Sequence, residues 1–236
     1  MYNTEDKLTN TGIMFLVVSS IFGVTGLALP RLAADVAGVD SIVTIPIAGA
    51  IALIFLYFTV KLSAEYPSKT VVEYVNDILG SFLGKICGVI LTLYILSVSG
   101  IVLRIFADAV KGLMLPQTPL EIIMISMIFT STYLTMNGIS SISKVCEIFI
   151  PIIIIVSAAL ILLSLKHFDI EEFYPIFSMG AKPILLGVPN IFTAFVGFEI
   201  LMFITPFTDK NNNVLKYSIW GMIIPTCIYT FHQFWG

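Results

Sequence analysis

The first long apolar segment of this chain contains a stretch in which an α-helix is difficult to continue. Residues 23–30 read GVTGLALP, with two glycines three positions apart and a proline close behind. Glycine and proline both weaken a helix. In the hydrocarbon of a bilayer, backbone groups released by a break need other partners, so a break is expected only where protein or a water-filled cavity covers it. A break at this depth predicts a binding site. Close helix packing by Gly23 and Gly26 is the alternative.

The composition places the chain in a membrane. Of its 236 residues, 58% are hydrophobic and 11% are charged, whereas roughly a quarter of the residues in a soluble domain are charged. A net charge of −3 and the lack of a basic patch with interleaved aromatic residues argue against nucleic-acid binding. Residues 1–10 are polar and lead into the interrupted apolar segment, which is not the pattern of a cleavable signal peptide.

Neither the cysteines nor the histidines predict a metal site. Cys87, Cys146 and Cys227 have no metal-ligand spacing, and small core-packing side chains are the expected role. His167 lies among acidic residues in a polar stretch, residues 166–182, which favours a hydrated loop over a metal site. We therefore expect no cofactor and no metal.

Seven apolar segments are long enough to cross a bilayer. They are expected at residues 11–37, 41–63, 83–110, 120–136, 139–165, 183–207 and 214–236. The sequence therefore predicts an all-α integral membrane protein that forms a single transmembrane domain over residues 1–236.

A shorter amphipathic stretch precedes the third of these segments, at residues 70–83. Thr70-x-x-Glu73 matches a capping box, and the apolar residues that follow lie on one face of a helix. This pattern predicts a helix lying in the membrane interface, with a loop packed on the protein as the alternative. Gly84 and Gly88 then match a small-residue packing motif.

Three of the ionisable side chains within the apolar segments are candidates for function: Arg104, Asp108 and Glu199. Such charges are costly in a membrane and indicate functional sites by default. Arg104 and Asp108, four residues apart, are candidates for gating or helix pairing, and a position at the membrane interface is the alternative. Glu199 is the only acid well inside an apolar run, and it lies in a second interruption, AFVGFE (194–199). A hydrogen-bonded structural carboxyl is the alternative for Glu199.

The two interruptions lie five spans apart, in the first and sixth apolar segments. This arrangement predicts a five-plus-five inverted repeat in which the first and sixth helices are broken. The first repeat would cover about residues 11–165 and a partial second repeat about residues 183–236. Half-helix N-termini can bind a carboxylate, and unwound backbone can bind an amine. A small zwitterion such as an amino acid suits both.

Four short motifs carry a resemblance that runs along essentially the whole chain: GVTGLALP (23–30), SAEYP (63–67), AFVGFE (194–199) and PF (206–207). With them the chain resembles the endospore germination permease family, the B-type subunits of nutrient germinant receptors, which is grouped with the amino acid–polyamine–organocation transporters. The resemblance implies a ten-helix transporter-like fold in the spore inner membrane or bacterial cell membrane. It also implies that the protein senses a small nutrient, usually an amino acid, with a larger membrane subunit and a lipoprotein as partners.

The resemblance and the two breaks together imply a ligand site at both interruptions. Its expected residues are Gly23, Thr25, Gly26, Leu27, Phe195, Gly197, Phe198 and Glu199. Seven spans stand where the family implies ten, so we expect a C-terminally truncated or partial member.

Three hypotheses of function follow from these features. A germinant-binding receptor subunit is favoured, and a proton- or ion-coupled amino-acid permease is the alternative. A membrane enzyme is not expected, because no nucleophile with a base, no metal cluster and no carboxylate pair is visible in the sequence.

Overall fold

The computed structural model describes residues 7–23, 29, 33, 35, 38–164, 181–209 and 213–233. In these ranges most residues are helical, which confirms the expected all-α class. The helices are α1 (Asn10–Phe22), α3 (Ser41–Glu65), α4 (Val71–Leu113), α5 (Leu120–Met136), α6 (Ile139–Ser164), α7 (Ala181–Phe192), α8 (Leu201–Ile204) and α9 (Val214–Gln233). Short 3₁₀ turns are η1 (Gly38–Asp40), η4 (Thr193–Phe195), η5 (Phe198–Ile200) and η6 (Thr205–Phe207).

Four helices, α3, α4, α6 and α9, are long and apolar enough to cross a membrane. The bent pair Ile184–Phe195 and Phe198–Phe207 makes a fifth if it is counted as one span. At 13 and 17 residues, α1 and α5 are apolar but shorter than this test requires. The described residues therefore contain four to five candidate spans, fewer than the seven expected from the sequence.

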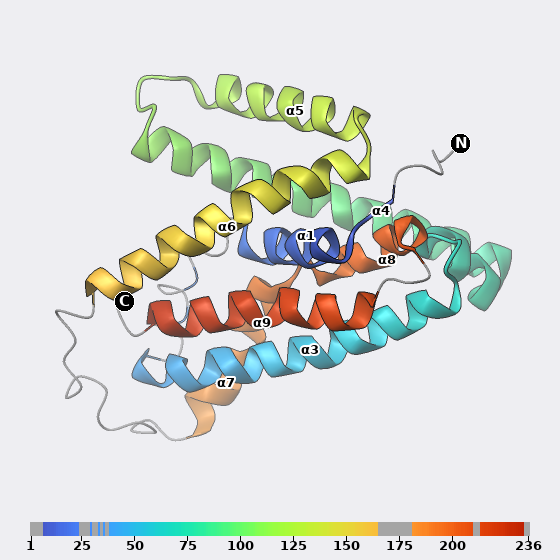
Figure 1. Cartoon of the computed structure of the whole chain (residues 1–236), viewed down its shortest axis with the longest axis horizontal. Helices are drawn as coiled ribbons and strands as arrows, with labels where there is room; N and C mark the ends of the chain where they lie inside the picture. The colour runs from blue at the N-terminus through green and yellow to red at the C-terminus, as the bar shows by residue number, and fades with distance from the viewer. Residues whose placement is uncertain are drawn as a thin grey trace.

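The centre of the molecule is a bundle built around α1. This helix packs against α6 and α9, and α3 packs against α9 and α7 (Figure 1). Where α9 meets α1, a Cβ added to Gly221 would lie 2.8 Å from the Cβ of Val17 and 2.9 Å from the carbonyl oxygen of Met14. Small residues at helix interfaces permit such close approach, so Gly221 fixes the distance between these helices.

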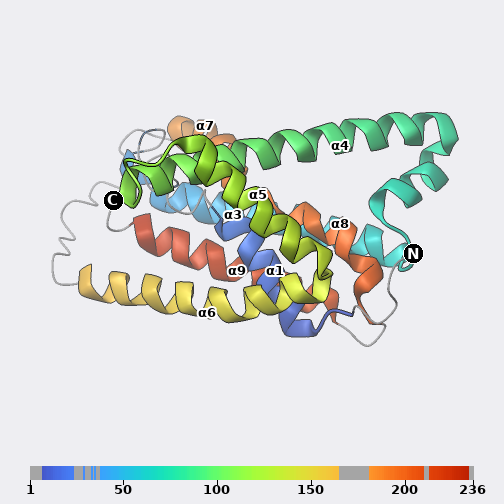
Figure 2. The same ribbon diagram turned by 90° about the horizontal axis from the view of Figure 1, so that it is seen from above.

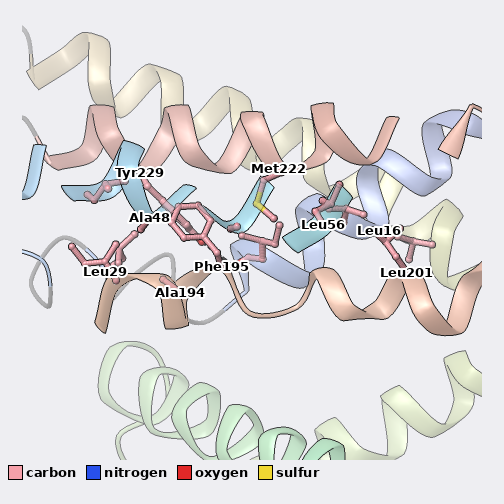
Figure 3. Close-up of a cluster of buried hydrophobic side chains, with 14 of the residues drawn as sticks. Leu16, Leu29, Ala48, Leu56, Ala194, Phe195, Leu201, Met222 and Tyr229 are labelled. Atoms are coloured by element: carbon pink, nitrogen blue, oxygen red, sulfur yellow. Dashed lines mark hydrogen bonds between the residues drawn. The ribbon is translucent and has the colours of Figure 1, made fainter. Parts of the chain in front are cut away.

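The buried core joins segments from both ends of the sequence. Figure 3 shows Leu16 of α1 near Leu56 of α3, and Phe195 beside Tyr229 of α9. Outside this bundle, large apolar side chains are widely exposed, for example Phe82 and Phe129 at 78% and 75%. An apolar exterior of this kind suits a hydrocarbon environment.

The longest helix, α4, lies along the outside of the bundle and has α5 as its main neighbour (Figure 2). Gly80 interrupts it with φ 78° and ψ 165°, a conformation that glycine adopts readily because it has no Cβ. The expected amphipathic helix therefore ends at Gly80 rather than at residue 83, and the following helix continues to Leu113 rather than to residue 110. The capping box is confirmed, since Glu73 Oε2 accepts from the Thr70 backbone N–H at 2.7 Å.

The prediction of core-packing cysteines differs from the structure at one position. Cys87 and Cys146 are half-buried as core-packing residues can be, but Cys227 is exposed. The polar stretch predicted as a hydrated loop, residues 166–182, lies outside the described residues up to residue 180.

Candidate functional site

The first predicted break follows the end of α1. The helix begins with the Thr9 side chain, which accepts from the Gly12 N–H at 2.9 Å, and it ends at Phe22. Gly23 follows with φ −35° and ψ −133° and is exposed. The last carbonyls of any helix lack partners within the helix. They must therefore find partners elsewhere in the fold.

Tyr229 of α9 supplies one of these partners. Its hydroxyl donates to the carbonyl oxygen of Ile21 at 2.8 Å, and the side chain is 1% exposed. Its ring stacks on Phe22 with centroids 5.5 Å apart and meets Phe195 edge-on at 5.8 Å. Tyr229 thus connects the end of α1 to the segment that leads into the second break, as Figure 3 shows for Phe195 and Tyr229.

The second predicted break contains a sharp change of direction. The segments Ile184–Phe195 and Phe198–Phe207 are bent by 45°, which makes them either a broken span or a re-entrant loop. Between them Gly197 has φ 132° and ψ −23°. L-residues with a side chain rarely adopt this φ, so the sequence needs glycine here.

The bend at Gly197 meets the last turn of α1. A Cβ at Gly197 would lie 2.5 Å from the carbonyl oxygen of Ser20, near the C-terminal end of α1. The backbone of the bend therefore lies directly against the last turn of α1. Segments that are more than 170 residues apart in the sequence are in contact here, and the Ser20 carbonyl oxygen faces the α-carbon of Gly197.

Glu199 is the charged group at this contact. Its Oε2 accepts from the Gly197 N–H at 2.7 Å, and its Oε1 accepts from the Tyr94 hydroxyl of α4 at 3.0 Å. The carboxylate lies in the first turn of the helical segment that starts at Phe198, where the positive end of the backbone dipoles favours a negative charge. Glu199 thus joins α4 to the bend through its two oxygens.

The remaining residues predicted for the ligand site lie in two places. Thr25, Gly26 and Leu27 lie outside the described residues. Phe195 is fully buried in the core, and Phe198 is half-buried and packs against the same core. Both phenylalanines therefore belong to the hydrophobic core next to the bend.

Arg104 and Asp108 pair with each other on α4. Their Nε–Oδ2 distance is 2.9 Å, and their side chains are 61% and 54% exposed. Arg104 is ten residues beyond Tyr94, about 15 Å along the helix at 1.5 Å per residue. The pair is therefore separate from the Glu199 carboxylate.

Sequence reasoning missed a second polar cluster at the start of α1. Glu147 of α6 accepts from the hydroxyls of Thr9 and Thr11 at 2.8 and 3.1 Å. Lys7 pairs with Asp209 at 2.5 Å, and the Leu8 N–H donates to the Phe207 carbonyl. These contacts attach the start of α1 both to α6 and to the end of the bent segment. Nothing in the local pattern around Glu147 indicates such a distant partner.

Among the described residues, no group of three or more histidine, cysteine, aspartate or glutamate side chains could hold a metal ion. In the part of the chain that the structure describes, the polar groups at the bend include the Glu199 carboxylate, the Tyr94 phenol, the Gly197 N–H and the Ser20 carbonyl. They are suited to hydrogen bonding and charge pairing with a small polar molecule.

These helices define an all-helical integral membrane protein, and comparison with known proteins identifies its family. Residues 7–235 match the family described as "Spore germination protein", and the chain belongs to that family. It is 27% identical to spore germination protein A2 of Bacillus subtilis over 96% of this chain and 62% of the relative. It is 26% identical to the B. subtilis protein YndE over 97% of this chain and 63% of the relative, and 25% identical to spore germination protein B2 over 98% and 62%.

The chain spans less than two thirds of the length of these relatives. No solved structure matches it. The relatives are spore germination proteins rather than enzymes, in agreement with the expectation from the sequence.

Proposed function

We propose that this chain is the membrane subunit of a nutrient germinant receptor, and that it binds a small germinant, an amino acid, where the bend at Gly197 meets the end of α1. Family membership and the names of its relatives support a role in germination. The observation that carries the proposed site is the contact of Gly197 with Ser20, beside the Glu199 carboxylate.

The chemistry of this surface suits a zwitterion. Ser20 C=O, near the C-terminal end of α1, and the Glu199 carboxylate both favour a positively charged amine. The Gly197 N–H, at the start of a helical segment, favours a carboxylate. Gly23, Thr25, Gly26, Leu27 and Phe198 belong to the same proposed site through their places at the two breaks.

The hydrogen bond of Glu199 gives this proposal a mechanism. Glu199 Oε2 occupies the Gly197 N–H at 2.7 Å, so an incoming ligand carboxylate competes with an internal one. When the ligand takes the N–H, the released Glu199 carboxylate pairs with the ligand amine. Because Tyr94 also donates to Glu199, this exchange changes a contact between the bend and α4.

A local exchange of this kind shifts the balance between conformations only if the ligand binds one of them better. In the proposed receptor the two conformations are inward- and outward-facing states of a five-plus-five inverted repeat, with residues 11–165 and 183–236 in its two halves. A larger membrane subunit and a lipoprotein sense the shift, in the spore inner membrane or the bacterial cell membrane. The 45° bend between Ile184–Phe195 and Phe198–Phe207 supports this scheme.

The alternative is a proton- or ion-coupled amino-acid permease that uses the same site. The hydrogen bond between Tyr94 and Glu199 favours it, because intramembrane carboxylates commonly belong to proton relays.

The proposal is tested by removing the charge of Glu199. We would compare binding of labelled amino acids to the purified chain and to Glu199→Gln. The substitution keeps the size of the side chain and removes its charge, so affinity should fall several-fold. Glu121→Gln, an exposed acid in the first turn of α5, is the matched control. Identical binding in Glu199→Gln and the wild-type chain would contradict the proposal. Proton-coupled uptake into vesicles that Glu199→Gln abolishes would favour the permease.

A further inference from the structure

Residues 198–207 run back along α1, from the bend to the start of that helix. At the bend Gly197 lies against Ser20, and at the other end the Leu8 N–H donates to the Phe207 carbonyl at 2.9 Å. These two contacts lie at opposite ends of α1, a helix of 13 residues that is about 20 Å long at 1.5 Å per residue. The two segments are therefore antiparallel neighbours that are joined at both ends.

The middle of this pair is packed as well. Leu16 of α1 and Leu201 belong to the same buried cluster, where Figure 3 shows them together. The ion pair between Lys7 and Asp209 is exposed, and exposed ion pairs contribute little to stability. The backbone hydrogen bond and the buried leucines are thus the main contacts that join the two segments. We call α1 and residues 198–207 the paired segments.

A carboxylate on α6 holds the paired segments at the start of α1. Glu147 Oε1 accepts from the hydroxyls of both Thr9 and Thr11. Each carboxylate oxygen offers about two acceptor sites, so α1 uses both sites of this oxygen. The two helices also approach closely here, because a Cβ added to Gly12 would collide with the Ser143 hydroxyl and lie 3.2 Å from Glu147 Oε1.

From these contacts we propose that the paired segments move as one body and that Glu147 is the side chain that fixes this body to α6. When the two hydroxyls leave Glu147, the start of α1 separates from α6. The second segment follows, because the backbone hydrogen bond between the segments remains. It turns at Gly197, whose φ of 132° is open to glycine. A change at the bend is thereby carried along α1 to the end where Lys7 and Asp209 are exposed. This movement does not depend on the identity of the germinant.

The test is hydrogen–deuterium exchange of the purified full chain, read by mass spectrometry of its peptides. Exchange reports the local opening of hydrogen-bonded backbone. Glu147→Ala removes the acceptor of both hydroxyls and leaves the Thr9 cap on the Gly12 N–H in place. We expect several-fold faster exchange in α1 and, together with it, in residues 198–207, although the substituted side chain is bonded to α1. Exchange in α5, which packs mainly on α4, should not change.

A second variant separates α1 from α6 without changing Glu147. Gly12→Ala places a methyl group against the Ser143 hydroxyl and should produce the same joint increase. Gly100→Ala is its control, because an added Cβ there meets nothing within 4 Å. Lys144→Ala, at an exposed position one turn before Glu147, is the control for Glu147→Ala. Both controls should exchange as the wild-type chain does.

Three results would overturn the proposal. Faster exchange in α1 with unchanged exchange in residues 198–207 would show that the two segments move separately. An equal increase in every helix would show a loss of overall stability rather than the movement of one body. Unchanged exchange throughout a folded Glu147→Ala chain would show that Glu147 does not hold α1.

Discussion

Replacing Tyr229 by phenylalanine should loosen the end of α1 while keeping the aromatic packing. The substitution removes the hydroxyl that donates to the Ile21 carbonyl at 2.8 Å in a fully buried position. Leaving a buried acceptor without its partner costs about 1–3 kcal/mol in water-soluble proteins. Side-chain hydrogen bonds measured inside a membrane protein average about 0.6 kcal/mol, with a maximum near 1.7. For Tyr229→Phe we therefore expect a loss of about 1 kcal/mol in the free energy of unfolding.

Tyr229→Leu should cost more than Tyr229→Phe, because it also removes the ring contacts with Phe22 and Phe195. Each aromatic pair contributes about 0.5–1.5 kcal/mol, so the total loss should be about 2–4 kcal/mol. The assay is unfolding of the purified chain by sodium dodecyl sulfate titrated into mild-detergent micelles, followed by circular dichroism.

The control for both substitutions is Tyr133→Phe, since Tyr133 is 71% exposed on α5 and its variant should unfold with the wild-type chain. Two results would refute the reasoning: a Tyr229→Phe chain as stable as wild type, or one as unstable as Tyr229→Leu. The first would mean that the Ile21 carbonyl finds another partner, and the second that the hydroxyl rather than the ring dominates the contact.

Three further predictions use the same unfolding assay or a simple titration. Gly221→Val should lose about 1–3 kcal/mol by overpacking, because an added Cβ lies 2.8 Å from Val17; a variant as stable as wild type would mean that α9 can move away from α1. Glu73→Ala removes the carboxylate that accepts from the Thr70 N–H and should cost about 0.5–2 kcal/mol; an unchanged unfolding midpoint would contradict the role of this cap. The hydrogen bond and charge of Asp77 raise the pKa of Lys69 above its usual value. The pair therefore stabilises the fold below that usual value, and the stabilisation is lost as the pH rises through the raised pKa of Lys69. Asp77→Asn should lower the pKa of Lys69 in an NMR titration, and an unmoved pKa would contradict the pairing.

Local features of the fold were predictable from sequence because their causes are local. The capping box at Thr70 and Glu73 needs residues three apart, and both its bonds are present. The expected fourth segment, residues 120–136, matches the bounds of α5. Gly80 was missed as a turning point because a single glycine within a helical pattern is compatible with a continuous helix. Only its φ of 78° in the fold makes it a break.

The candidate site was predictable only in part. The glycine and the acid at 197 and 199 stood out because each is unusual inside an apolar run. The partner of Glu199 did not, since Tyr94 is 105 residues away from it. The same holds at the end of α1, where Tyr229 is 208 residues away from Ile21. Aromatic residues are common in such a chain, which has nine tyrosines. Which tyrosine reaches which break is decided by how the helices pack, and a single sequence does not carry that information.

Binding of labelled amino acids to the purified chain in detergent, with Gly197→Leu beside it, tests the central claim most directly. The account predicts saturable binding that is lost in Gly197→Leu, because a side chain at this position collides with Ser20 of α1. Gly100→Leu, where an added side chain meets open space, should bind as the wild-type chain does. Circular dichroism and a monodisperse elution profile would establish that each variant is folded. A folded Gly197→Leu chain with unchanged affinity, or a folded wild-type chain that binds no amino acid, would contradict the account.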